Sequence, residues 1–254
     1  MKQRVISGAI VAAVTVLCAY FGGFLLKGIL LFILAWGSYE FIRIRKNEFN
    51  YLLYVILLIA SLLMYLYHEH AQEWMLLEML LLLTISVFCE KESFTEVSAV
   101  FLMSVLLGYG VYYIDYIQNL DKWLLGYVII ISYLTDTFAF FVGRKFGKHK
   151  MNARVSPKKT IEGSLGGWFF GFITSYLWAS FFHFFGLDAK LLFAASLCLP
   201  FVSEIGDLIF SLIKRHYGVK DFSNLIPGHG GILDRLDSNL ICIILFGTLL
   251  NLFL

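Results

Sequence analysis

Residues 203–237 read SEIGDLIFSLIKRHYGVKDFSNLIPGHGGILDRLD, a charged stretch between two apolar segments. Carboxylates, amines and guanidinium groups are mixed there with glycines and two histidines. Ionisable groups that border hydrocarbon are costly and are usually retained for function. A mixture of acids, bases and glycines suits a site that holds a metal ion and phosphate groups. The stretch therefore predicts a membrane-embedded fold with chemistry at the membrane surface.

The composition of the rest of the chain supports a membrane protein. The 254 residues are 59% hydrophobic and only 15% charged, whereas a soluble domain carries about 25% charged residues. An apolar run of about 20 residues can span a bilayer as a helix. Nine such segments predict an all-α, polytopic integral membrane protein with about nine transmembrane helices, at about 5–26, 28–42, 51–67, 75–89, 97–114, 123–142, 163–186, 190–213 and 232–253.

The basic residues predict how these spans are oriented. With nine spans, all of the 20 Lys and Arg residues except Lys27, Lys122 and Lys190 fall on the same side as the N-terminus. Because loops rich in Lys and Arg stay in the cytoplasm, we expect a cytoplasmic N-terminus and an external C-terminus. The charged loops 143–162 and 214–231 are then cytoplasmic. The chain divides into N-terminal transmembrane helices (1–120) and a C-terminal transmembrane region (121–254).

The eighth segment places four polar residues on one helix face. Asp207, Ser211, Lys214 and Arg215 stand at i, i+4, i+7 and i+8, a spacing that puts side chains on the same face. Lys and Arg at a helix end can simply extend to lipid headgroups. That explanation does not account for Asp207, which lies about two turns deeper.

The ninth segment begins with two acids on one face, Asp234 and Asp237. Acids near a helix N-terminus are favoured by the helix dipole, so capping is one explanation. The residues just upstream are Gly228, His229, Gly230 and Gly231. Glycines let backbone N–H groups approach phosphate at a helix N-terminus, and aspartates suit Mg²⁺. Taken together, these features favour a metal–nucleotide site over capping.

A second polar stretch, around 144–162, is strongly basic and includes Lys158, Lys159 and Thr160. Basic loops of this kind are attracted to anionic lipids, and they can also clamp a triphosphate or a lipid phosphate. The two interpretations are compatible. The next residues contain GxxxGxxxG at Gly163, Gly167 and Gly171, which predicts close helix packing, with dimerisation as the alternative.

These polar positions form a pattern that resembles a known family. The run Ser211-x-x-Lys214-Arg215, then Lys220-Asp221, then PGHGGxxDRxD at 227–237 closely resembles the signature of phosphatidate cytidylyltransferases (CDP-diacylglycerol synthases). Asp136-Thr137, Gly143-Arg144, Gly147-Lys148 and SPKKTxEG at 156–163 are similar to the family's second conserved region. The resemblance covers the C-terminal half, and the first 120 residues resemble the family only as a variable set of spans.

The resemblance implies a Mg²⁺-dependent transfer of CMP from CTP to phosphatidic acid, giving CDP-diacylglycerol and pyrophosphate in phospholipid biosynthesis. It implies metal ligands at Asp207, Asp234 and Asp237, with a second cation left open. The expected catalytic residues are Lys214, Arg215, His229 and Arg235. The expected substrate-binding residues are Ser211, Lys158, Lys159, Thr160, Gly228, Gly230 and Gly231.

The expected partners are CTP, phosphatidic acid and the lipid bilayer. We expect no nucleic-acid partner, and whether a homodimer forms is left open. The expected location is the plasma membrane, with the active site facing the cytoplasm. Two alternatives are an ion-coupled transporter, since buried acids also mark ion pathways, and a CTP-dependent polyprenol kinase, which would release CDP in place of pyrophosphate.

Overall fold

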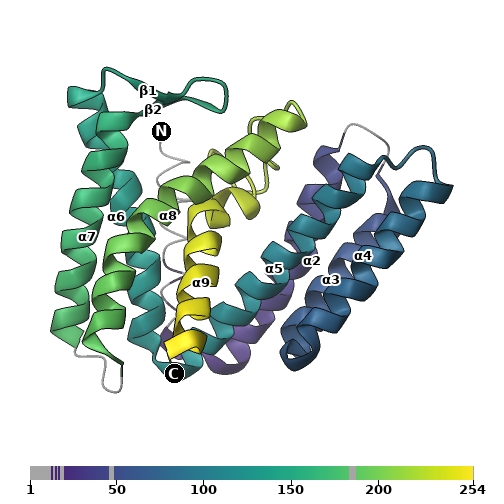
Figure 1. Ribbon diagram of the computed structural model, residues 1–254, viewed down its shortest axis with the longest axis horizontal. Helices are drawn as coiled ribbons and strands as arrows, with labels where there is room; N and C mark the ends of the chain where they lie inside the picture. Colours follow the sequence, from purple (N-terminus) through teal and green to yellow (C-terminus); the bar gives the residue numbers. More distant parts are fainter. Residues whose placement is uncertain are drawn as a thin grey trace. The chain divides into compact units, whose positions relative to one another are not determined.

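A computed structural model of the chain describes residues 20–45, 49–182 and 187–253, together with single positions 13, 15 and 17. Most of the predicted first span, about 5–26, lies outside these residues, as do Lys2 and Arg4. Each of the eight later segments contains a helix in the described part of the chain (Figure 1). These helices are α2 (Gly23–Ile44), α3 (Tyr51–Leu66), α4 (Ala71–Phe88), α5 (Phe94–Leu120), α6 (Lys122–Phe146), α7 (Ile161–Phe182), α8 (Ala189–His216) and α9 (Leu233–Phe253).

The helices confirm the prediction of an all-α, multi-pass membrane protein. Within the described residues, six stretches are long and apolar enough to cross a membrane: Gly23–Ile44, His68–Phe88, Phe94–Leu120, Lys122–Phe146, Ala189–His216 and Leu233–Phe253. In hydrocarbon only helices and closed barrels satisfy every backbone hydrogen bond, which explains why the apolar segments are helical. The number of nine spans stays a prediction.

The chain forms two compact units. The first contains Met1–Asp115 and Asp221–Leu233, and the second contains Tyr116–Lys220 and Asp234–Leu254. In the first unit, α3 packs against both α2 and α4, and a short 3-10 helix (His68–His70) leads into α4. The buried Arg45 side chain just after α2 pairs with Glu92 and with Glu96, the latter at 2.7 Å. Asn50 also donates to Glu92 at 2.6 Å, so these polar groups fix the connections between helices.

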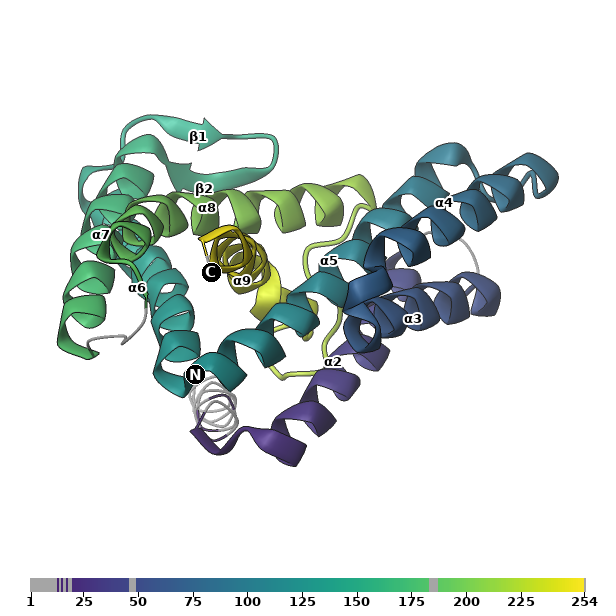
Figure 2. The same cartoon turned by 60° about the horizontal axis from the view of Figure 1, so that its bottom comes forward.

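In the second unit, α6, α7 and α8 pack against one another. Figures 1 and 2 both show these three helices side by side, with a small hairpin at one end of them. The hairpin consists of β1 (Lys150–Asn152) and β2 (Ser156–Thr160), which pair antiparallel. The segment 143–162, expected as a loop, is therefore mostly regular: α6 continues to Phe146, the hairpin follows, and α7 begins at Ile161.

The glycine stripe of α7 brings its neighbours close. Gly163, Gly167 and Gly171 are all buried on the same face of α7. A Cβ atom at Gly163 would lie 2.8 Å from the carbonyl oxygen of Ala139 on α6, and one at Gly171 would lie 3.0 Å from Pro200 Cβ on α8. The prediction of close helix packing is confirmed, because the stripe contacts helices of the same chain.

Candidate active site

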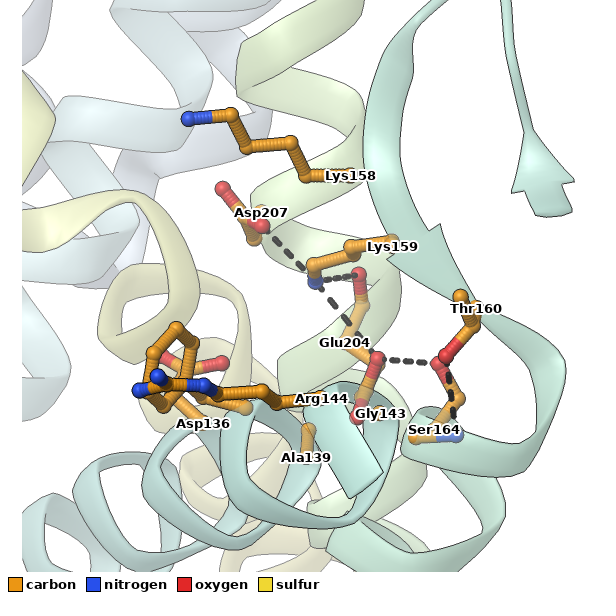
Figure 3. Close-up of a pocket in the computed structure, with 12 residues that line it drawn as sticks. Asp136, Ala139, Gly143, Arg144, Lys158, Lys159, Thr160, Ser164, Glu204 and Asp207 are labelled. Atoms are coloured by element: carbon orange, nitrogen blue, oxygen red, sulfur yellow. Dashed lines mark hydrogen bonds and ion pairs between the residues drawn. The ribbon is translucent and has the colours of Figure 1, made fainter. Parts of the chain in front are cut away.

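The second unit contains a cavity of about 340 Å³ at the base of the hairpin, with several charged side chains in its lining. Residues from α6, the hairpin, α7 and α8 line it (Figure 3): Asp136, Ala139, Phe140, Gly143, Arg144, Lys158, Lys159, Thr160, Gly163, Ser164, Glu204 and Asp207. The two segments that the sequence singled out, around 144–162 and around 207, thus meet in one place.

Lys159 lies at the centre of this cavity. Its Nζ is 2.7 Å from Oδ2 of Asp207 and 3.5 Å from Oε2 of Glu204, and Figure 3 shows the side chain pointing from β2 towards both acids. Burial by itself lowers the pKa of Lys159, but the charges of Asp207, Glu204 and Asp136 outweigh it and leave the pKa raised. The ammonium group is therefore charged at neutral pH.

Glu204 is a member of the site that the sequence reasoning missed. Its side chain is 2% exposed, and Oε2 accepts a hydrogen bond from Ser164 at 2.7 Å. Its Oε1 has no hydrogen-bond partner among the described residues. Buried polar groups are nearly always paired, so this oxygen marks a place for a further interaction. The available signal was an acid three residues before Asp207 in an apolar segment.

Lys214 forms ion pairs with the other two predicted metal ligands, Asp234 and Asp237. Its Nζ is 2.7 Å from Oδ1 of Asp234 and 3.7 Å from Oδ2 of Asp237. Helices α8 and α9 approach closely here because Gly206 faces the backbone of α9, where an added Cβ would lie 3.0 Å from the Asp237 carbonyl oxygen. The structure thus distributes the three acids over two lysines.

The donor set fits a hard cation by its chemistry. All three predicted metal ligands offer carboxylate oxygens, which Mg²⁺ prefers, and each is contacted by a lysine ammonium. Among the residues that the structure describes, no group of three or more His, Cys, Asp or Glu side chains is arranged to hold a metal ion. The acids are therefore suited to a cation in type, while their present partners are lysines.

The remaining predicted residues of the second unit differ in their surroundings. Ser211 is buried on α8. Arg215 is exposed and donates to the Val219 carbonyl oxygen at 2.8 Å, just beyond the helix end. Arg235 has a buried Nε without a hydrogen-bond partner among the described residues.

Lys158 and Thr160 belong to the hairpin and both line the cavity. Lys158 is exposed. The hydroxyl oxygen of Thr160 accepts a hydrogen bond from the Gly163 N–H at 3.2 Å, which satisfies one of the free donors at the start of α7. Thr160 therefore also has a structural role.

The glycine-rich turn belongs to the first unit. Gly228 and Gly230 have φ of 78° and 81°, a left-handed conformation that glycine adopts without steric cost. The Ile226 N–H donates to the Gly230 carbonyl oxygen at 2.8 Å, and the His229 N–H donates to that of Ile226 at 2.9 Å. These bonds close a tight turn that ends at α9.

Comparison with known proteins places these features in a family. Residues 2–253 match the cytidylyltransferase family. The chain is 35% identical to the phosphatidate cytidylyltransferase of Bacillus subtilis, an alignment that covers 100% of this chain and 98% of that protein. It is 33% identical to the phosphatidate cytidylyltransferase of Staphylococcus aureus (75% and 76% covered) and 40% identical to that of Staphylococcus haemolyticus (63% and 62% covered). The chain therefore belongs to the phosphatidate cytidylyltransferase family.

Proposed function

We propose that this protein is a membrane-bound nucleotidyltransferase that transfers CMP from CTP to phosphatidic acid, giving CDP-diacylglycerol and pyrophosphate. The observation that carries the proposal is the similarity over the whole chain to the Bacillus subtilis phosphatidate cytidylyltransferase. The cavity supports it, because acids and bases converge there beside an exposed basic hairpin. Neither alternative function has comparable support.

In the proposed reaction, a phosphate oxygen of phosphatidic acid attacks the α-phosphorus of CTP. A new P–O bond forms, the bond from the α-phosphorus to the oxygen that bridges to the β-phosphorus breaks, and pyrophosphate leaves with that oxygen. The lipid phosphate is already anionic at pH 7, so no strong base is needed. Phosphoryl chemistry of this kind depends mainly on positioning and charge stabilisation.

The basic residues of the second unit would provide that stabilisation. Lys158 and Lys159 would bind the triphosphate or the lipid phosphate at the cavity, and Lys214 and Arg235 would neutralise charge near the acids of α9. The Nε of Arg235, which has no hydrogen-bond partner in the part of the chain that the structure describes, supports this role, since an anion would satisfy it. The predicted roles of Arg215 and Ser211 have no further support from their contacts, and those of His229 and the glycines remain predictions.

We propose Asp207, Asp234 and Asp237 as the residues that would hold Mg²⁺. When bound, the ion would neutralise phosphate charge and orient the reacting groups. The lysine contacts support the assignment, because the same carboxylate oxygens already attract cations. A second cation remains an alternative, with Glu204 as a nearby carboxylate.

We also propose nine spans, a cytoplasmic N-terminus and a site that faces the cytoplasm of a bacterial plasma membrane. The distribution of Lys and Arg supports the orientation, and the bacterial relatives support the membrane. Homodimerisation stays a prediction, since the glycine stripe of α7 is used within the chain.

Labelled CTP distinguishes the candidate functions. Membranes that contain the protein are incubated with phosphatidic acid or a polyprenol and with CTP labelled at the α- or the γ-phosphate. Nucleotidyl transfer predicts that the α-label enters the phosphatidic-acid-derived lipid and that the γ-label appears in pyrophosphate. A γ-label in the polyprenol would identify a kinase, and no labelled lipid under any condition would contradict both activities.

The role of Asp207 is tested with a matched substitution on the same helix. Asp207→Asn should lower the turnover number by about 100-fold or more, the loss typical of an essential charge-stabilising group. Asp188→Asn should not, because Asp188 is exposed at the start of α8, where it accepts a hydrogen bond from the Lys190 N–H, and Asn caps helices equally well. Near-normal activity of Asp207→Asn would contradict the assignment.

A further inference from the structure

Glu40 is a fully buried acid on α2, with 0% of its surface exposed. Its carboxylate accepts three hydrogen bonds from the segment that precedes and starts α9. Oε1 accepts from the Ser223 hydroxyl at 2.6 Å and from the Ile232 N–H at 3.0 Å, and Oε2 accepts from the Leu233 N–H at 2.9 Å. All of these residues belong to the first unit.

These hydrogen bonds satisfy donors that the helix cannot satisfy itself. The first N–H groups of an α-helix have no partner within the helix, and they carry the positive end of its dipole. A residue in the sequence just before the helix usually accepts from them. For α9 the acceptor instead comes from α2, which is far away in the sequence.

Gly231 provides the space for this arrangement. A Cβ atom on Gly231 would overlap the Glu40 carboxylate, with Oε2 only 2.5 Å away. Gly231 has no positive φ, unlike Gly228 and Gly230, so alanine fits its backbone conformation. The glycine is therefore required at this position by the neighbouring carboxylate.

We infer that Glu40 is a positioning residue for the proposed nucleotidyl transfer, because it fixes the glycine-rich turn and the first turn of α9. Asp234 directly follows Leu233 in that helix, and Asp237 stands one turn further on. A shift in the position of the first turn of α9 therefore displaces both carboxylates and Arg235 together. The inference rests on the proposed function for its catalytic consequence, while the hydrogen-bond role of Glu40 can be tested independently.

The first experiment replaces the carboxylate by an amide of the same shape. Glu40→Gln leaves one acceptor oxygen and puts an NH₂ group against a backbone donor. We expect kcat per folded molecule to fall about 10- to 100-fold, the loss typical of a misplacement of about 1 Å. The KM for CTP should change less than about threefold, because the carboxylate is engaged by the Ser223 hydroxyl and by two backbone N–H groups. Glu40→Asp keeps the charge and should recover part of the loss.

The matched control is Glu78→Gln. Glu78 is also a buried acid in an apolar helix of the first unit, but it accepts from Ser104 at 2.7 Å on α5. Its amide variant should keep kcat within about twofold of the wild type, because its hydrogen bond is to Ser104 and not to the start of α9. A fall in kcat for Glu78→Gln equal to that of Glu40→Gln would attribute the loss to burial in general and would overturn the inference.

Amide hydrogen exchange gives a readout that does not depend on activity. In Glu40→Gln, residues 223–233 should exchange about tenfold faster, the change that corresponds to one lost hydrogen bond. The Glu78→Gln protein should exchange there at the wild-type rate. Unchanged exchange at Ile232 and Leu233 in Glu40→Gln would overturn the inference even if activity fell.

A double substitution tests the contact between Glu40 and Gly231. Gly231→Ala should lower the unfolding midpoint in the wild-type background, because the new methyl group displaces the carboxylate. In Glu40→Ala the same change should cost little, because the carboxylate is gone. If the losses in unfolding midpoint from Gly231→Ala and Glu40→Ala were additive, the contact between Gly231 and the Glu40 carboxylate would be contradicted. If the wild-type protein instead makes no CDP-diacylglycerol, the proposed function fails, while exchange and the double substitution still decide the role of Glu40 at α9.

Discussion

A methyl group on Gly167 would collide with three groups that support the candidate active site. An added Cβ would lie 2.7 Å from the Thr135 carbonyl oxygen, 2.8 Å from Ala139 Cβ and 2.9 Å from Glu204 Oε1. The first two belong to α6 and the third to α8. Because the carbonyl oxygen is part of a helix backbone, α7 itself would have to move in Gly167→Ala.

The size of the effect follows from two opposing terms. Overpacking a tight contact costs about 1–3 kcal/mol, and three simultaneous contacts place Gly167→Ala near 3 kcal/mol. Alanine favours a helix over glycine by about 1 kcal/mol. We therefore expect a net destabilisation of about 2 kcal/mol.

Gly126→Ala is the matched control on α6. Its added Cβ would meet only Trp178 Cζ2, at an ordinary contact distance of 3.7 Å. Only the higher helix propensity of alanine over glycine then contributes, and it predicts a stabilisation of about 1 kcal/mol. Titration of the detergent-solubilised proteins with a denaturing detergent, followed by circular dichroism, should separate the two variants by about 3 kcal/mol in unfolding free energy.

Two results would refute this reasoning. Equal stability of Gly167→Ala and Gly126→Ala would mean that α6 and α7 are not held at the distance that the structure gives. Unchanged CDP-diacylglycerol synthesis in a destabilised Gly167→Ala protein would mean that activity does not depend on the position of Glu204 beside Lys159. We expect activity to fall, because Glu204 Oε2 and Asp207 together position the Lys159 ammonium.

Two further predictions concern the hairpin and the residues that flank it. Lys159→Met removes the cation that neutralises Glu204 and Asp207, and it should destabilise the protein by about 3 kcal/mol, the low end for a broken buried pair, because Asp207 is 24% exposed. Lys158→Met, at an exposed neighbour, should leave the unfolding midpoint unchanged, and equal losses would contradict the pairing. The His149 side chain and backbone N–H groups hold the pKa of Glu162 down at about 2, so its contribution to stability is complete above about pH 4.5 and is lost as the pH falls towards 2. The difference in unfolding midpoint between wild type and Glu162→Gln should therefore be constant from pH 7 to about 5 and shrink below that, and a difference that grew on acidification would reverse the sign of this reasoning.

Several members of the candidate site could be identified from the amino-acid sequence alone. Asp207, Asp234 and Asp237 stand out as acids in or beside apolar segments, and Lys158 and Lys159 stand out in a basic loop. The sequence does not indicate which lysine forms an ion pair with which acid. Lys159 contacts Asp207, whereas Lys214 contacts Asp234 and Asp237, and these pairings depend on how closely the helices approach.

The missed residues share one property. Glu40 and Glu204 are acids within apolar helices, and neither is among the residues that carry the family resemblance. Their importance lies entirely in their partners: the start of α9 for Glu40, and Ser164 and Lys159 for Glu204. Only the cost of burying a carboxylate pointed to them, and that cost does not name a partner.

The sequence by itself determined the class of the protein, the approximate positions of its helices from α2 onward, and the family. Length and apolar content are local properties, and a long apolar segment must become a helix because hydrocarbon offers its backbone no other hydrogen-bond partner. Only the tertiary structure showed that the hairpin lines the cavity, which lysine pairs with which acid, and that Glu40 caps α9. These features join residues far apart in the chain, and the packing of glycine-lined helices sets the distances between them.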